Sequence, residues 1–188
     1  MHDCQRDFQG WTQFSVLPMF RPMETRIRPA TQADIRAINA IYNHYVGGST
    51  CTWHLTEETD EGRAVWLKAR GPAHPAIIIE SEGQVLGWGS LSSYNTRQGW
   101  SGAVEDSVFI HHNHHGKGLG KKVLQELLHQ ADALGHHSVI ARISGEQTAS
   151  RQLHASLGFE ESGILRGVGR KFGQKLDCVY MLRSRPQP

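Results

Sequence analysis

The chain has 188 residues, 38% of them hydrophobic, and a formal net charge of +2. This length and composition fit one globular domain with its own core, and the small net charge argues against a nucleic-acid-binding protein. No apolar run approaches the roughly 20 residues of a membrane span. The three cysteines, Cys4, Cys51 and Cys178, form no C-x-x-C pair, which argues against a zinc site or a disulfide framework.

Residues 1–22 lack the continuous apolar segment of a signal peptide. We interpret them as a loosely ordered extension before a single domain at residues 23–188, and we expect a cytoplasmic protein with reduced thiols. Four of the twelve histidines crowd into residues 111–115. No acidic residue stands beside them, and adjacent loop residues rarely converge on one ion, so we predict no metal site.

The first half of the chain predicts a strand, two helices and two further strands. Thr31 and Asp34 resemble a capping box at a helix start, and apolar residues then recur at helical spacing. Glycine pairs and Gly-Pro are the expected helix ends. The expected elements are a strand at 26–28, a helix from Thr31 to Gly47-Gly48, a helix from Thr56 to Gly71-Pro72, and hairpin strands at 76–80 and 84–91.

The second half alternates strands with helices before two closing strands. The order of elements is therefore β-α-α-β-β-β-α-β-α-β-β, which predicts an α/β or α+β domain with a mixed sheet and helices on its faces. The expected elements are a strand at 103–110, a helix from Leu119 to about Leu134, a strand at 137–143, a helix at 149–157, and strands from Phe159 and at 176–182.

A glycine-rich turn, His115-Gly116-Lys117-Gly118-Leu119-Gly120, joins one of these strands to the long helix. Glycine lets a backbone approach an anion closely because no Cβ intervenes. A helix N-terminus adds unpaired N–H donors and a partial positive charge, and Lys121 adds a cation. The turn therefore fits a phosphate site, although a plain loop between strand and helix remains the alternative on this pattern alone.

Three phosphate-binding patterns compete for this turn. A P-loop is excluded because Lys121 is followed by Lys122 rather than Ser or Thr. The dinucleotide fingerprint G-x-G-x-x-G is excluded because the last glycine comes one residue early. The remaining pattern, [Gln/Arg]-x-x-Gly-x-[Gly/Ala], binds the pyrophosphate of coenzyme A and fits except for His115 at its first position.

The segment at 107–134 resembles the cofactor-binding motif of the GNAT superfamily of N-acetyltransferases. Other segments, in order and spacing, resemble its phosphinothricin and methionine-sulfoximine acetyltransferase family. The resemblance implies a mixed, mostly antiparallel central sheet with helices on both faces, acetyl-CoA as co-substrate, a small amine as acceptor and a homodimer. The matching segments are residues 27–31, 41–46, 49–53, 104–110, 153–159 and 165–173.

The resemblance also implies which residues meet acetyl-CoA. The backbone of Val108, Phe109 and Ile110 is expected to pair with the pantetheine arm, and the N–H of Phe109 or Ile110 to polarise the thioester carbonyl. Gln147 matches a family Asn that contacts the cofactor, and a polar residue at a helix start is the alternative. The residues expected to hold the pyrophosphate are His115, Gly116, Lys117, Gly118, Leu119, Gly120 and Lys121.

Two titratable residues have expected catalytic roles through the same resemblance. Glu105 is the expected general base, because an amine near neutral pH is protonated and must lose a proton before it attacks. His154 is expected to protonate the leaving thiolate, because imidazole titrates near pH 7. The alternatives are a solvent-exposed strand glutamate and a histidine packed within a helix.

The loop ahead of the base carries arginines that bind the substrate carboxylate in this family, and Arg97 matches one of them. Trp53, Tyr94 and Asn95 are the other expected substrate contacts. Asn95 and Ser101 stand where basic residues are expected, and Trp53 replaces a Phe, which indicates a smaller pocket. These departures point away from tight recognition of phosphinothricin.

The sequence therefore predicts acetylation of the α-amine of a small amino acid or analogue, such as methionine sulfoximine, methionine sulfone or phosphinothricin, by direct attack in a ternary complex. Two alternatives remain open. One is acetylation of another small amine or of a protein N-terminus, and the other is a non-catalytic acyl-CoA-binding sensor.

Overall fold

The computed structural model describes residues 23–185, and the extension expected at residues 1–22 lies outside this range. Seven strands and four α-helices follow one another in the predicted order, with short 3-10 turns at Gln32–Asp34, Gln98–Trp100 and His112–His114. The strands are β1 (Arg26–Pro29), β2 (Ala76–Ser81), β3 (Gln84–Ser93), β4 (Ala103–Ile110), β5 (Ser138–Ser144), β6 (Glu160–Lys171) and β7 (Gln174–Ser184). The helices are α1 (Ile35–Gly48), α2 (Asp60–Lys68), α3 (Leu119–Ala133) and α4 (Thr148–Ala155).

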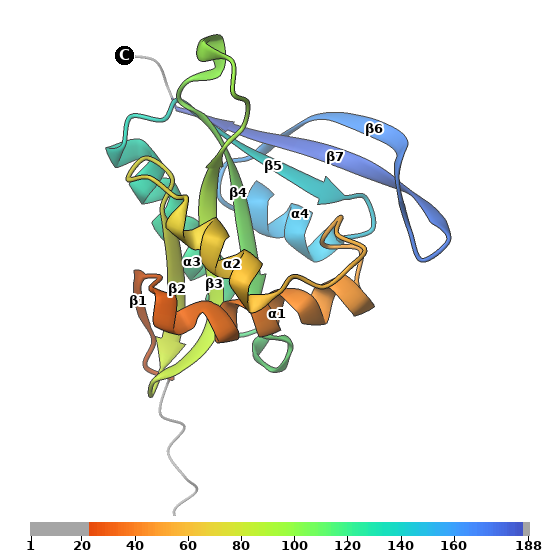
Figure 1. Ribbon diagram of the computed structural model, residues 1–188. Helices are drawn as coiled ribbons and strands as arrows, with labels where there is room; N and C mark the ends of the chain where they lie inside the picture. Colours follow the sequence, from red (N-terminus) through yellow and green to blue (C-terminus); the bar gives the residue numbers. More distant parts are fainter. Residues whose placement is uncertain (1–22, 186–188) are drawn as a thin grey trace, which may run out of the picture.

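The strands form one sheet in the order β1-β2-β3-β4-β5-β7-β6. Only β4 and β5 run parallel, and every other neighbouring pair is antiparallel. Helices α1 and α2 lie across one face of the sheet and α3 lies behind it (Figure 1). The expectation of a mixed, mostly antiparallel sheet with helices on both faces is confirmed. Within residues 23–185, no helix combines the length and the apolar character that a membrane crossing requires.

The entry to α1 follows the predicted capping box. The Asp34 carboxylate accepts hydrogen bonds from the Thr31 N–H at 2.8 Å and from the Thr31 hydroxyl at 2.9 Å. Arg28 on β1 donates to both oxygens of the same carboxylate, at 2.7 and 2.8 Å. Its hydrogen bonds lower the pKa of the buried Asp34 to about 2. The cap therefore also ties the helix start to the sheet edge.

The second helix begins later than predicted. We expected it to start at Thr56, but α2 begins at Asp60, and Thr59 is the N-cap whose hydroxyl accepts from the Gly62 N–H at 3.0 Å. The Glu58 carbonyl instead accepts hydrogen bonds from the side chains of Asn39 and Asn43 on α1. These tertiary contacts hold the preceding residues in a non-helical conformation, which local propensity does not reveal.

Two apolar clusters determine which face each helix covers. Because side chains alternate along a strand, Ile78 faces α1 while Ile77 and Ile79 face α3. A bulge in the pairing of β2 with β3 places Leu86 in the cluster with α3 although Trp88, two residues on, lies in the cluster with α1. A Cβ on Gly89 would lie 2.6 Å from Val123 on α3, so a glycine at this position allows α3 to pack closely on β3. Leu153 of α4 and Leu157, two residues beyond its end, pack against the same cluster as α3.

Candidate active site

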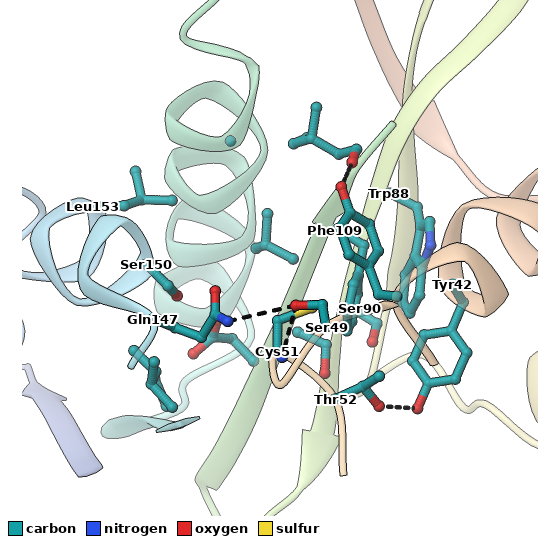
Figure 2. Close-up of a pocket in the computed structure, with 18 of the residues that line it drawn as sticks. Tyr42, Ser49, Cys51, Thr52, Trp88, Ser90, Phe109, Gln147, Ser150 and Leu153 are labelled. Atoms are coloured by element: carbon teal, nitrogen blue, oxygen red, sulfur yellow. Dashed lines mark hydrogen bonds between the residues drawn. The ribbon is translucent and has the colours of Figure 1, made fainter. Parts of the chain in front are cut away.

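A cavity of about 840 Å³ opens beside β4 and reaches the start of α3. Figure 2 shows Gln147, Ser150 and Leu153 on one side, and Tyr42, Ser49, Cys51 and Thr52 on the opposite side. The sheet contributes a lining of residues from β3, β4 and β5. Strand, helix and loop residues far apart in the sequence therefore meet around one space.

The cavity exists because β4 and β5 separate partway along their length. Their parallel pairing ends at Glu105 opposite Ile140, whereas β4 continues to pair with β3 as far as Ile110. The edge of β4 that faces β5 is therefore unpaired from residue 106 onward. An unpaired strand edge offers backbone donors and acceptors to an extended ligand.

The register identifies which backbone N–H groups face this opening. The His111 N–H donates to the Leu86 carbonyl of β3 at 2.8 Å. Successive N–H groups of an antiparallel strand point to opposite edges. The N–H groups of Val108 and Ile110 therefore face the opening, and that of Phe109 faces β3. Of the two candidates for polarising a thioester carbonyl, the geometry favours Ile110.

The glycine-rich turn lies at the end of the cavity where α3 begins. Gly116 and Gly118 have φ values of +72° and +74°, and a Cβ on either would meet nothing within 4 Å. The left-handed backbone and the open space in front of it fit a bound diphosphate. Lys121 lines the cavity here, and Gly120 instead allows close approach of Leu153 on α4.

Three other predicted cofactor residues have specific surroundings. The ring of His115 is bonded through Nε2 to the Tyr45 hydroxyl at 2.6 Å, and the Tyr45 hydroxyl donates to the Ile110 carbonyl. Leu119 is buried in the core. Lys117 lies outside the cavity lining and donates to the Asn113 carbonyl at 3.4 Å. Their contacts with a cofactor stay predictions.

Gln147 connects the two walls of the cavity. It is the N-cap of α4, and its side-chain amide donates to the Thr50 hydroxyl at 2.8 Å and more weakly to Ser49 at 3.4 Å. Both acceptors belong to the segment that follows α1, and Figure 2 shows Gln147 beside Ser49 of this segment. A long ligand in the cavity would pass close to this bridge.

Glu105 lines the cavity at the point where β4 and β5 separate. Its carboxylate forms a bidentate ion pair with Arg142 of β5, with Nε–Oε1 and Nη2–Oε2 distances of 2.8 Å each. These hydrogen bonds raise the pKa of Arg142. The Glu105 side chain keeps 21% of its surface exposed and Arg142 keeps 44%, so both groups remain accessible from the cavity.

His154 is buried beside Asp106 on the α3 face of β4. Its Nδ1–H donates to the Ser150 carbonyl at 2.7 Å, and Nε2 lies 3.1 Å from Asp106 Oδ2. Burial lowers the pKa of His154, but the hydrogen bond and charge of Asp106 outweigh it, so the pKa is raised. Both ring nitrogens thus have acceptors within the protein, which favours the packed alternative over an acid aimed at a thiolate.

Arg63 of α2 forms part of the cavity wall on the face covered by α1. Its guanidinium lies 4.4 Å from the centroid of the Tyr42 ring and 5.0 Å from that of Trp66. The residue is only 5% exposed, and Nε and Nη2 are buried with no hydrogen-bond partner among the described residues. Desolvation by burial lowers the pKa of this arginine.

The substrate contacts expected from the loop between β3 and β4 lie elsewhere. Trp53 lines the cavity, whereas Tyr94, Asn95 and Arg97 stand outside its lining in the described chain. Tyr94 packs against Trp100, and the Arg97 N–H is bonded to the Asn95 side chain at 2.9 Å. The structure does not bring these three residues to Glu105, and their substrate role stays a prediction.

Sequence reasoning missed four residues of the site, namely Tyr45, Arg63, Asp106 and Arg142. Asp106 directly follows the candidate base, and an acidic residue within an apolar strand was the one available signal. Tyr45 looked like part of an apolar helix face, and the two arginines resembled ordinary surface charges. Within the described residues, no group of three His, Cys, Asp or Glu side chains is arranged to hold a metal ion.

Comparisons with known proteins agree with this geometry. Residues 38–159 match the model of the acetyltransferase (GNAT) family. An L-methionine sulfoximine/L-methionine sulfone acetyltransferase of Pseudomonas paraeruginosa is 40% identical over 85% of this chain and 94% of its own length. An L-amino acid N-acyltransferase of Escherichia coli is 38% identical over 86% and 96%, respectively.

A crystal structure gives the same result. A GNAT superfamily phosphinothricin acetyltransferase of Sinorhizobium meliloti, in complex with acetyl-CoA, matches with a TM-score of 0.82 at 33% identity and covers 85% of this chain and 88% of that one. The chain therefore belongs to the acetyltransferase (GNAT) family, whose enzymes take their acetyl group from acetyl-CoA.

Proposed function

We propose that this acetyltransferase transfers an acetyl group from acetyl-CoA to the α-amino group of a small amino acid, by direct attack within a ternary complex. The observation that carries the proposal is one continuous cavity that joins the glycine turn, the unpaired edge of β4 and Glu105. The names of relatives that act on methionine sulfoximine and on L-amino acids support the choice of acceptor.

The chain's own residues suit the parts of acetyl-CoA. The turn at residues 116–120 and the first N–H groups of α3 would hold the diphosphate, with Lys121 adding charge. The free edge of β4 would pair with the pantetheine arm, and an N–H group that faces the opening, that of Val108 or Ile110, would donate to the thioester oxygen. Bound there, acetyl-CoA supplies the activated acyl carbon beside the end of β4.

Glu105 then acts as the general base. An acceptor ammonium gives one proton to the Glu105 carboxylate, and the freed nitrogen attacks the thioester carbon. The C–N bond forms as the C–S bond breaks, and the second proton of the reacting nitrogen passes to the departing thiolate. The base returns its own proton to solvent. His154 takes no part in these proton transfers, because its two N–H groups point to Asp106 and Ser150.

The buried Arg63 supports an acceptor whose side chain ends in oxygen atoms. A buried guanidinium with unsatisfied donors favours an anionic or strongly hydrogen-bonding neighbour. Sulfone, sulfoximine and phosphinate groups all present such oxygens. Three aromatic rings surround Arg63, those of Tyr42, Trp66 and Trp88. They would contact the carbon atoms of the acceptor's side chain.

We also propose a homodimer, a single domain over residues 23–188, and a cytoplasmic location. The side chains of Leu165, Val168 and Phe172 on β6 and the turn after it are 48%, 60% and 55% exposed, which suits an interface with a second copy. One sheet runs from residue 26 to residue 184. The free thiols of Cys51 and Cys178 are compatible with a reducing compartment.

Thiol release from acetyl-CoA, measured with a panel of amines, tests the function. We expect methionine sulfone, methionine sulfoximine or phosphinothricin to stimulate release far more than a tripeptide with a free N-terminus. Glu105→Gln should lower kcat by roughly 100-fold or more while calorimetry shows unchanged affinity for acetyl-CoA. If acetyl-CoA binds and no amine stimulates release, the sensor alternative replaces this proposal. Preference for the tripeptide would identify a protein N-terminus as the acceptor.

A further inference from the structure

Arg142 has no role in the reaction as described so far, yet it is the cation in direct contact with the candidate base. Both of its hydrogen bonds to Glu105 are 2.8 Å long, in the parallel fork geometry of a bidentate guanidinium–carboxylate pair. The guanidinium is thus already oriented to receive two carboxylate oxygens. The same pair occupies the carboxylate that an incoming ammonium must reach.

The sheet explains why these two side chains meet. Glu105 pairs with Ile140 in the last parallel pair of β4 and β5. Arg142 lies two residues further along β5, so its side chain points to the same face as those of Ile140 and Glu105. Because the strands separate beyond this pair, the Arg142 side chain spans the start of the opening. Its 44% exposure places it within reach of a ligand.

An α-amino acid carries its ammonium and its carboxylate on the same carbon atom. The cation that binds the carboxylate must therefore lie beside the group that accepts the ammonium proton. Arg142 meets this requirement through direct contact with Glu105. Arg63 instead lies among the rings of Tyr42, Trp66 and Trp88, and the ion-pair partner of Glu105 in the described chain is Arg142. Arg97 lies outside the cavity lining of the described chain.

We propose that Arg142 is the residue that binds the acceptor's carboxylate, through an exchange of partners with Glu105. In the free enzyme the two side chains neutralise each other. A zwitterionic amino acid places its carboxylate on the Arg142 guanidinium and its ammonium on the Glu105 carboxylate, so that one ion pair becomes two. The base is thereby released from arginine only when an α-amino acid occupies the site. This inference rests on the proposed acetylation of amino acids and assigns its specificity for the carboxylate.

Arg142→Gln tests the exchange with two acceptors that differ only in the carboxylate, namely methionine sulfone and its carboxamide. Thiol release is measured with saturating acetyl-CoA. We expect the variant to raise the KM for methionine sulfone by about 10- to 100-fold, the range for loss of a charged hydrogen-bonded partner. The kcat/KM for the carboxamide should not fall in this variant and should rise, because the carboxamide cannot draw Arg142 away from Glu105 and the substitution frees the base. Arg142→Lys should give an intermediate KM because it keeps the charge and loses the fork.

Arg183→Gln is the matched control. Arg183 forms a similar double contact with Asp132, at 3.2 and 3.1 Å, and lies outside the cavity lining. The Arg183→Gln variant should keep the KM and kcat/KM of the parent enzyme for both acceptors. Melting temperature and acetyl-CoA affinity show whether each variant is folded.

Two results would overturn the inference. An equal loss on both acceptors in Arg142→Gln would mean that Arg142 only orients Glu105. A carboxylate-selective loss in Arg97→Gln instead of Arg142→Gln would assign the role to the loop. Failure of the parent enzyme to acetylate any amino acid is a different outcome, because it refutes the proposed function itself.

Discussion

Replacing His154 by leucine removes one member of the buried pair that it forms with Asp106. The two residues are 4% and 7% exposed, and Asp106 Oδ1 has no hydrogen-bond partner among the described residues. Leaving a buried carboxylate without its cation costs about 3–5 kcal/mol. For a chain of this size, each kcal/mol lowers the melting temperature by about 2–4 °C, so His154→Leu should melt roughly 10 °C below the parent protein.

Asp106→Asn is the matched control for this change. An amide at position 106 donates to Nε2 of a neutral imidazole, so the hydrogen bond survives and the loss should be near 1 kcal/mol. Urea unfolding followed by tryptophan fluorescence measures both free energies. A His154→Leu variant within 1 kcal/mol of the parent protein would refute the reasoning.

The pH dependence of the same pair has a definite sign. Because the pKa of His154 is raised in the folded protein, the pair's contribution is fully present below the ordinary histidine pKa, near 6.5. It is lost as the pH rises through the folded value. The unfolding free energy of the parent protein should therefore fall relative to that of Asp106→Asn as the pH rises from 6 to 9. Parallel curves for the two proteins would contradict this interpretation.

Kinetics of the Asp106→Asn variant separate a structural histidine from a catalytic acid. Loss of the charged imidazole should change kcat at pH 7 by far less than the roughly 100-fold that removal of a general acid produces. The measurement is made well below the melting temperature. A 100-fold fall with unchanged acetyl-CoA affinity would restore the acid role that the family resemblance implies.

Three further predictions concern the helix cap, the glycine turn and the exposed strand. Asp34→Asn should lower the unfolding free energy by about 2 kcal/mol at pH 7, because the Asp34 pKa is about 2 instead of 3.8. This difference should vanish as the pH falls from 4 towards 2, and urea unfolding across that range checks it. Gly118→Ala, at φ +74°, should weaken coenzyme A binding about tenfold through backbone strain and the added Cβ, and an unchanged calorimetric affinity would argue against the diphosphate site. Light scattering should give twice the 21.0 kDa chain mass for the parent protein and the single mass for a Leu165→Lys/Val168→Lys double variant, and a monomeric parent protein would refute the dimer.

Local patterns predicted most elements of the fold. Apolar residues at helical spacing identified α1 and α3, because this periodicity reports which side of a helix faces the core. Two apolar runs on either side of the Glu82-Gly83 turn identified β2 and β3. The capping box of Thr31 and Asp34 could also be predicted, because its two residues are only three positions apart in the sequence. The predicted start of α2 was wrong, because hydrogen bonds from Asn39 and Asn43 to the Glu58 carbonyl keep the chain before Asp60 out of the helix.

The sequence by itself determined the order of elements, the glycine turn at the start of α3 and, through family motifs, Glu105 as the candidate base. Only the tertiary structure decided where β4 and β5 separate, and that Arg142 contacts Glu105, 37 positions away in the sequence. It also decided that the two ring nitrogens of His154 bind Asp106 and Ser150. The physical reason is the sequence separation over which each kind of interaction acts. Periodicity and turn chemistry act between residues a few positions apart, whereas the charges of the site meet through sheet register, which the whole folded chain establishes.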